Sequence, residues 1–173
     1  MIQELEDIIA NQLPTLLKEP EKWDSLLIDH FPPVIHRLAY RLSDTRTLFL
    51  HKMHNCERSK ALLHSHSWAL AVKVIEGGYE MGMGESENRD CAPTELKETI
   101  VKPGDVYEML DSRQWHYTKC LPETKYSYSI MLIGPRTRER KALNNDPLSL
   151  EQRHSLFDYF KNVPAGAKFV REG

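Results

Sequence analysis

The chain has 173 residues, enough for one domain with short extensions and a buried core. Its formal net charge is −2 and its acidic and basic residues are mixed, so no basic field favours binding to a nucleic acid or an anionic membrane. Three widely spaced cysteines argue against a disulfide framework and favour a reducing, cytoplasmic environment. No apolar segment approaches the roughly 20 residues that span a bilayer, and the first residues lack the features of a secretory signal.

The N-terminal third has apolar residues at helical spacing. They are Ile2, Leu5, Ile8, Ile9 and Leu13. Acidic residues occupy the other side, which predicts an amphipathic helix that covers a sheet; a helix that binds a partner is the alternative. The helical spacing continues past Pro20 to Trp23 and Leu27 and stops at Pro32. We therefore expect a helical extension over residues 1–33.

The pattern changes after these residues. Residues 34–42 form a short apolar run that suits either a helix or a strand. Residues 47–54 alternate in the manner of a strand, which places His51 and Met53 on one face. A register step of one residue would turn that face from the interior to solvent, so the sequence leaves both orientations of His51 open.

The sequence Leu-His-Ser-His-Ser-Trp at residues 63–68 begins an apolar, strand-like segment. Because successive side chains of a strand point to opposite faces, His64 and His66 share a face. Two imidazoles placed in this way can bind one metal ion. Gly77 and Gly78 then predict a tight turn, where a positive φ costs glycine little, and the chain returns as a hairpin.

Further short strands are expected downstream. They cover residues 96–101, 106–110, 115–117 and 126–133. Many short strands with glycine and proline turns predict an all-β sandwich or barrel. Ser149, with Gln152 three residues later, forms a capping box that opens a C-terminal helix. The expected order is therefore a β-barrel over residues 34–146, followed by a C-terminal helix and tail over residues 147–173.

These motifs resemble those of the cupin family, whose fold is a jelly-roll barrel. The family's first motif has a His-x-His pair and a hairpin glycine, matched by His64, His66 and the turn at 77–78. Its second motif has a proline-glycine turn and a later histidine, matched at 103–104 and by His116. The resemblance implies an all-β cupin jelly-roll barrel of antiparallel strands with N-terminal and C-terminal α-helices packed outside. A group of small bacterial and phage cupins is similar in the same stretches.

The resemblance covers residues 47–135 and departs from the family pattern in two places. The usual glutamate ligand falls on Leu70 or Ala71, and a usual glycine falls on Arg58. The ligand set that the resemblance implies therefore consists of three histidines: His64, His66 and His116. Such a set suits one divalent metal ion, with Fe²⁺ favoured and Zn²⁺ or Ni²⁺ as alternatives.

Four other residues are candidates for supporting these ligands or for lining a pocket beside them. They are His51, Trp68, Glu108 and Tyr128. His51 could turn inward as a partner of the ligands or as a fourth ligand. A solvent-facing carboxylate is the alternative for Glu108, and a phenol packed in the core is the alternative for Tyr128.

Some cupin dioxygenases, including those that act on thiols and β-diketones, hold iron with three histidines. The resemblance therefore implies a metal-dependent dioxygenase that acts on a small organic substrate. A non-catalytic cupin that binds or senses a metal or small molecule is one alternative, and a degenerate structural cupin with hydrogen-bonded histidines is another. The expected partners are a small-molecule ligand and, from the family, a second copy in a homodimer, with no nucleic acid and no membrane.

Overall fold

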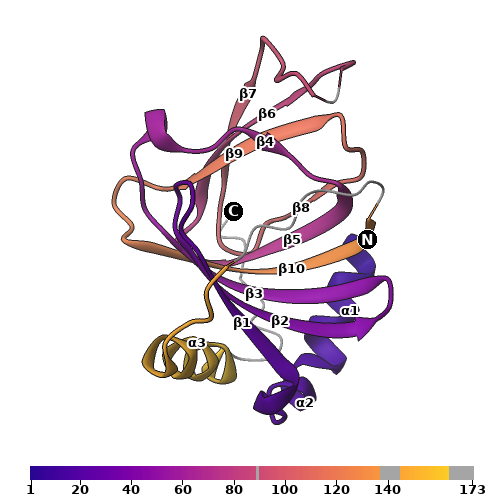
Figure 1. The fold of residues 1–173 in the computed structure, drawn as a ribbon, viewed down its shortest axis with the longest axis vertical. Coiled ribbons are helices and arrows are strands. Elements are labelled where there is room, and N and C mark those ends of the chain that lie inside the picture. Colours follow the sequence, from indigo (N-terminus) through magenta and orange to yellow (C-terminus); the bar gives the residue numbers. More distant parts are fainter. Residues whose placement is uncertain (89, 137–144, 164–173) are drawn as a thin grey trace, which may run out of the picture.

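The computed structural model of the protein describes residues 1–88, 90–136 and 145–163. The described strands form two antiparallel sheets that face each other, and the helices lie on the outer side of the larger sheet (Figure 1). Among the described strands no pairing joins one sheet to the other, so closure of the sheets into a barrel stays a prediction. The tail expected at the C-terminus lies outside the described residues.

The larger sheet has six strands in the order β1-β2-β3-β10-β5-β8. Their bounds are β1 (Trp23–Ile28), β2 (Ile35–Ser43), β3 (Arg46–His54), β5 (Trp68–Glu76), β8 (Val106–Met109) and β10 (Tyr126–Arg136). The smaller sheet has four strands in the order β4-β9-β6-β7. Their bounds are β4 (His64–Ser65), β6 (Tyr79–Glu85), β7 (Lys97–Val101) and β9 (Gln114–Cys120). The turn predicted between β5 and β6 is confirmed, with positive φ values of 85° at Gly77 and 76° at Gly78.

Three α-helices and two short 3₁₀ helices complete the described structure. Their bounds are α1 (Ile2–Asn11), α2 (Leu13–Leu16), α3 (Leu150–Asn162), η1 (Pro20–Lys22) and η2 (Arg58–Lys60). The capping box predicted for α3 is confirmed, because the Gln152 backbone N–H donates to Ser149 Oγ and the Ser149 N–H donates to Gln152 Oε1. None of the described helices combines the length and apolar content that a bilayer crossing requires.

The helix expected to continue through Trp23 and Leu27 was wrong, because these residues form β1. β1 pairs with β2 from Trp23 opposite Tyr40 to Ile28 opposite Ile35, which also shows that the ambiguous segment at 34–42 is a strand. Trp23 is buried, and its indole N–H donates to the backbone carbonyl of Leu16 at 3.0 Å. Backbone pairing with β2 outweighed the helical spacing, since tertiary context routinely overrides short apolar patterns.

Both faces of the six-stranded sheet carry buried side chains, and alternate residues of each strand point to opposite faces. Leu48 and Leu50 of β3 pack in one cluster with Leu5 of α1 and Phe160 of α3, on the helix-facing side. Met53 lies on the other side, in a cluster with residues of β6, β7 and β9. The opposite face of the same strands therefore looks into the space between the two sheets, where the predicted histidines lie.

Candidate metal centre

Two strands and the crossing between the sheets bring the three histidines together. His64 of β4 pairs directly with His116 of β9. The chain leaves the four-stranded sheet after Ser65 and joins the six-stranded sheet at Trp68, so His66 lies in the crossing. The single strand expected through His64 and His66 is thus interrupted. The two imidazoles still lie side by side, with ring centroids 4.8 Å apart.

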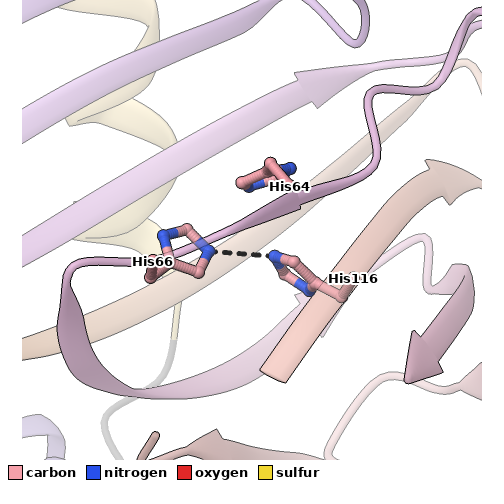
Figure 2. A group of neighbouring side chains, drawn as sticks. All are labelled: His64, His66 and His116. Atoms are coloured by element: carbon pink, nitrogen blue, oxygen red, sulfur yellow. Dashed lines mark hydrogen bonds between the residues drawn. The ribbon is translucent and has the colours of Figure 1, made fainter. Parts of the chain in front are cut away.

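The ring nitrogens converge on one point. One nitrogen of each histidine lies within 4.8 Å of the others, and Nε2 of His66 is 2.9 Å from Nε2 of His116 (Figure 2). Two imidazole nitrogens bound at about 2.1 Å to one ion are about 3 Å apart when they subtend about 90°. The observed separation fits neighbouring positions on a single ion. His116 is buried while His64 and His66 are partly exposed, so the group can be reached from one side.

A hydrogen bond sets the tautomer of His64, and burial sets the charge of His116. His64 Nδ1 donates to the backbone carbonyl of Leu62 at 3.0 Å, which leaves Nε2 as the acceptor nitrogen. A ligating histidine in metalloproteins commonly donates its other ring N–H in this way. Burial, followed by the nearby His64, holds the pKa of His116 well below its ordinary value, so its ring is neutral at pH 7. These donors fit a divalent metal ion.

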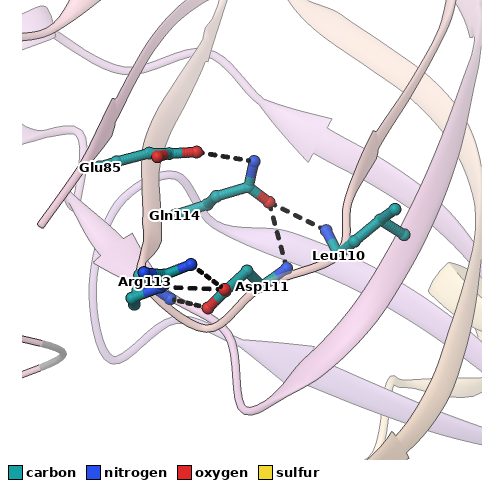
Figure 3. A network of polar contacts seen from close by, with 5 residues as sticks. All are labelled: Glu85, Leu110, Asp111, Arg113 and Gln114. Atoms are coloured by element: carbon teal, nitrogen blue, oxygen red, sulfur yellow. Dashed lines mark hydrogen bonds and ion pairs between the residues drawn. The ribbon is translucent and has the colours of Figure 1, made fainter. Parts of the chain in front are cut away.

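The loop before β9 is held by side-chain hydrogen bonds close to His116. Gln114 Oε1 accepts from the backbone N–H groups of Leu110 and Asp111, and Asp111 accepts from the backbone and guanidinium of Arg113 (Figure 3). Gln114 also donates to Glu85 of β6 at 3.4 Å. The bonds tie the end of β8 to the start of β9 and to β6, and so help to orient the strand that carries His116.

A cavity of about 80 Å³ adjoins the histidines between the two sheets. Its lining residues are Ile35, Arg37, His51, Met53, His64, His66, Val72, Tyr79, Tyr107, His116, Thr118, Ser129 and Met131. The orientation of His51, which the sequence left open, is inward. Burial raises the pKa of Tyr79 and of Tyr107, so both phenols are neutral at pH 7 and can act as hydrogen-bond donors.

Arg37 and His51 form a pair on the wall of this cavity. They are directly opposite each other in the β2–β3 register, and Arg37 Nε donates to His51 Nε2 at 2.8 Å. Burial and the guanidinium hold the pKa of His51 well below its ordinary value, so its ring is neutral. Sequence reasoning missed Arg37, because it lies in the segment whose secondary structure was ambiguous. The strand assignment would have placed it on one face with Ile35.

Two of the sequence candidates do not lie in the cavity. Glu108 lies on the helix-facing side of β8, where its carboxylate is 3.4 Å from the N-terminal ammonium of Met1. Tyr128 stacks on Tyr159 of α3, with ring centroids 3.6 Å apart. In both cases strand parity points the side chain away from the space between the sheets. Trp68 packs beside His66, with ring centroids 5.6 Å apart, but does not line the cavity.

No family model matches this sequence, and neither does any curated protein. Among solved structures it is similar to the hydroxypropylphosphonic acid epoxidase from S. wedmorenis, with 14% identity, a TM-score of 0.52, and coverage of 66% of this chain and 56% of that chain. A structure of Fe(II)-HppE with the alternative substrate (S)-1-HPP gives 15% identity, a TM-score of 0.52, and coverage of 66% and 57%. The match thus spans little more than half of the epoxidase.

At this identity the similarity concerns the fold alone. It supports the cupin fold that the two histidine motifs predicted, in a chain that consists mainly of β-strands in two antiparallel sheets. The narrower resemblance to small bacterial and phage cupins stays a prediction.

Proposed function

We propose that the protein binds one divalent metal ion through His64, His66 and His116 and acts as a metal-dependent dioxygenase on a small organic substrate. The observation that carries this proposal is the convergence of three ring nitrogens at the edge of a cavity between the sheets. Imidazole ligands suit Fe²⁺, with Zn²⁺ and Ni²⁺ as alternatives, and disfavour ions such as Ca²⁺ that prefer oxygen.

The residues around the group suit a catalytic metal better than a structural one. Three protein ligands leave coordination positions open, whereas structural zinc sites are closed by four. Met53, Val72 and Met131 supply apolar walls that limit the water beside the ligands. Bound Fe²⁺ would supply the reaction with dioxygen. The similar epoxidase has been solved in an Fe(II) form, which agrees with the preference for iron.

The first experiment measures metal content in protein purified without a metal-affinity tag. We expect one divalent ion per chain by elemental analysis, and loss of this metal in the double variant His64→Ala/His116→Ala. A matched control is His154→Ala, which removes an exposed histidine of α3 and should leave the metal content unchanged. Wild-type protein without metal, with a melting temperature unaffected by EDTA, would contradict the proposal and favour a structural cupin.

The second experiment tests turnover. Fe²⁺-loaded protein is mixed with a panel of small thiols, β-diketones and aromatic acids, and oxygen consumption is recorded. We expect consumption with at least one compound class and none in the double variant. Stoichiometric metal without oxygen consumption across the panel would contradict the dioxygenase and favour a binding or sensing protein.

A homodimer and a cytoplasmic location also stay predictions of the family resemblance and the composition. Sedimentation equilibrium of the metal-loaded protein would measure the oligomeric state directly.

A further inference from the structure

The cavity contains a guanidinium, that of Arg37, for which the described part of the chain offers no acidic partner. Arg37 reaches it from β2, donates through Nε to His51, and lies over the Phe49 ring with its guanidinium carbon 4.4 Å from the ring centroid. None of the ion pairs found among the described residues involves Arg37. Burial lowers its pKa to about 10, so the group is still protonated at neutral pH. The hydrogen bond found for this side chain uses Nε, and its two terminal amino groups have no acceptor among the described residues.

The charges that line the cavity also favour a negatively charged ligand. Its described lining includes one arginine and four histidines but no aspartate or glutamate. Three neutral imidazoles do not offset the charge of a bound dication, and the carboxylate ligand common in cupins is absent at Leu70 and Ala71. A buried charge without a counter-charge is costly. The site therefore favours an occupant that brings negative charge.

We propose that Arg37 binds the carboxylate of the substrate and that the substrate class is a small organic acid. This inference rests on the proposed function, since it names the substrate of the same site. The planar guanidinium pairs with a carboxylate through two parallel hydrogen bonds. His51 acts as a positioning residue: by accepting from Nε, it leaves the two terminal amino groups of Arg37 for the acid.

The size and lining of the cavity limit the length of the acid and set its orientation. The rows that face each other across it are Arg37, His51 and Ser129 on the six-stranded sheet and His64 and His116 on the smaller sheet. An acid held at Arg37 would thus present its other end toward the histidines. A volume of about 80 Å³ admits only a short acid, because a single water already needs at least about 10 Å³ on the same measure.

The test compares two probes of nearly equal size, glycolate and neutral glycolamide, on Zn²⁺-loaded and metal-free protein by calorimetry. Wild type should bind glycolate in preference to glycolamide in both forms. Arg37→Met should weaken glycolate binding by about 10- to 100-fold, the range for a hydrogen bond to a charged group, and should leave glycolamide binding unchanged. Arg37→Lys should retain part of the preference, because the charge remains while the paired geometry is lost.

Arg41→Met is the matched control. Arg41 lies on the same strand, is largely exposed and pairs with Asp44, so its removal should leave both probes unaffected. His51→Leu should weaken glycolate binding by a few fold, and His51→Gln should restore it because the amide oxygen can again accept from Arg37. Circular dichroism confirms that each variant is folded; if Arg37→Met is not, Arg37→Lys and His51→Leu decide the matter.

The outcomes separate this inference from the proposed function. Metal content is measured on every variant and should be the same as in wild type. Metal-loaded wild type that binds both probes equally, or Arg37→Met that binds glycolate as wild type does, would overturn the inference while leaving the metal site in place. Wild type that takes up no metal would overturn the proposed function, and the glycolate comparison in metal-free protein would then still decide the role of Arg37.

Discussion

The two faces of the six-stranded sheet are built from the same strands but have different chemistry. Toward the helices, β3 presents Leu48 and Leu50, which belong to the largest apolar cluster of the described structure. Toward the smaller sheet, the same strand presents His51, which lines the cavity together with residues of two smaller apolar clusters. Alternation along a strand thus places stabilising packing and the candidate site back to back, one residue apart.

This arrangement allows the site to contain groups that would be costly in a continuous core. The helix-facing cluster buries apolar side chains from α1, α3 and five strands, a large favourable term. The cavity side contains the half-buried guanidinium of Arg37 and the buried imidazoles of His51 and His116, which lose hydration. We infer that burial of apolar side chains on the helix-facing side compensates for the hydration lost on the cavity side. Variants on the two sides should therefore affect stability and metal binding differently.

The largest expected effect comes from the helix-facing side. Leu50→Ala should lower the free energy of unfolding by about 2–5 kcal/mol, the usual range for deleting a fully buried leucine side chain. Metal stoichiometry should not change, because Leu50 points away from the cavity. Chemical denaturation and elemental analysis measure the two quantities. Leu110→Ala, at a residue 58% exposed, is the control. An equal loss of unfolding free energy in the two variants would contradict the stabilising role of the helix-facing side.

His116→Ala on the cavity side should show the opposite pattern. We expect the affinity for Zn²⁺ to fall by at least about 100-fold, since changes to residues that merely support ligands already cost 10- to 100-fold. The free energy of unfolding in EDTA should change less than in Leu50→Ala. Competition with a chromophoric chelator measures the affinity. An unchanged affinity would remove His116 from the ligand set.

The helix-facing side has a histidine pair of its own, which should make stability depend on pH. The rings of His36 and His54 lie side by side, with centroids 4.6 Å apart, and burial followed by the charges of His54 and Lys52 lowers the pKa of His36 to about 4. Between pH 4 and pH 6.5 the unfolded chain, whose histidine pKa is near 6.5, binds more protons than the folded chain. Stability should therefore be full above about pH 6.5 and fall by about 1–3 kcal/mol as the pH drops to about 4.

His36→Gln tests this explanation in metal-free protein, where ligand protonation cannot contribute through lost metal. Urea denaturation between pH 4 and pH 7 should show a shallower slope for the variant than for wild type. Parallel profiles would assign the pH dependence to other groups.

The smallest expected effect concerns the loop in front of β9. Gln114→Ala removes the acceptor for the Leu110 and Asp111 backbone N–H groups and should destabilise the protein by about 1 kcal/mol, as is usual for lost hydrogen bonds. The affinity for Zn²⁺ should fall by only a few fold, because His116 keeps its place in β9. Gln3→Ala on α1 removes an exposed glutamine whose side chain donates to Asp7, and it is the control for thermal unfolding.

Much of the local structure could be predicted from the sequence. The alternation at 47–54, the glycine pair at 77–78 and the capping box at Ser149 depend on neighbouring residues, and the structure confirms all three. The pairing of Trp23–Ile28 with β2 could not be predicted, because its apolar residues fit a helix equally well and the decisive hydrogen bonds come from another segment. The orientation of Glu108, which the sequence left open, could not be predicted for a related reason, since its face depends on which side of β8 the second sheet covers.

For the candidate site, the kinds of ligand and their motifs follow from the amino-acid sequence, because residue type and short spacing are properties of the chain alone. Three features depend on the folded protein: the change of sheet between Ser65 and Trp68, the pairing of His116 with His64, and the contact of Arg37 with His51. Those contacts join residues far apart in sequence. They form because each strand needs a hydrogen-bonding partner and each apolar face must be buried. Which segment meets these needs cannot be predicted from a local sequence pattern.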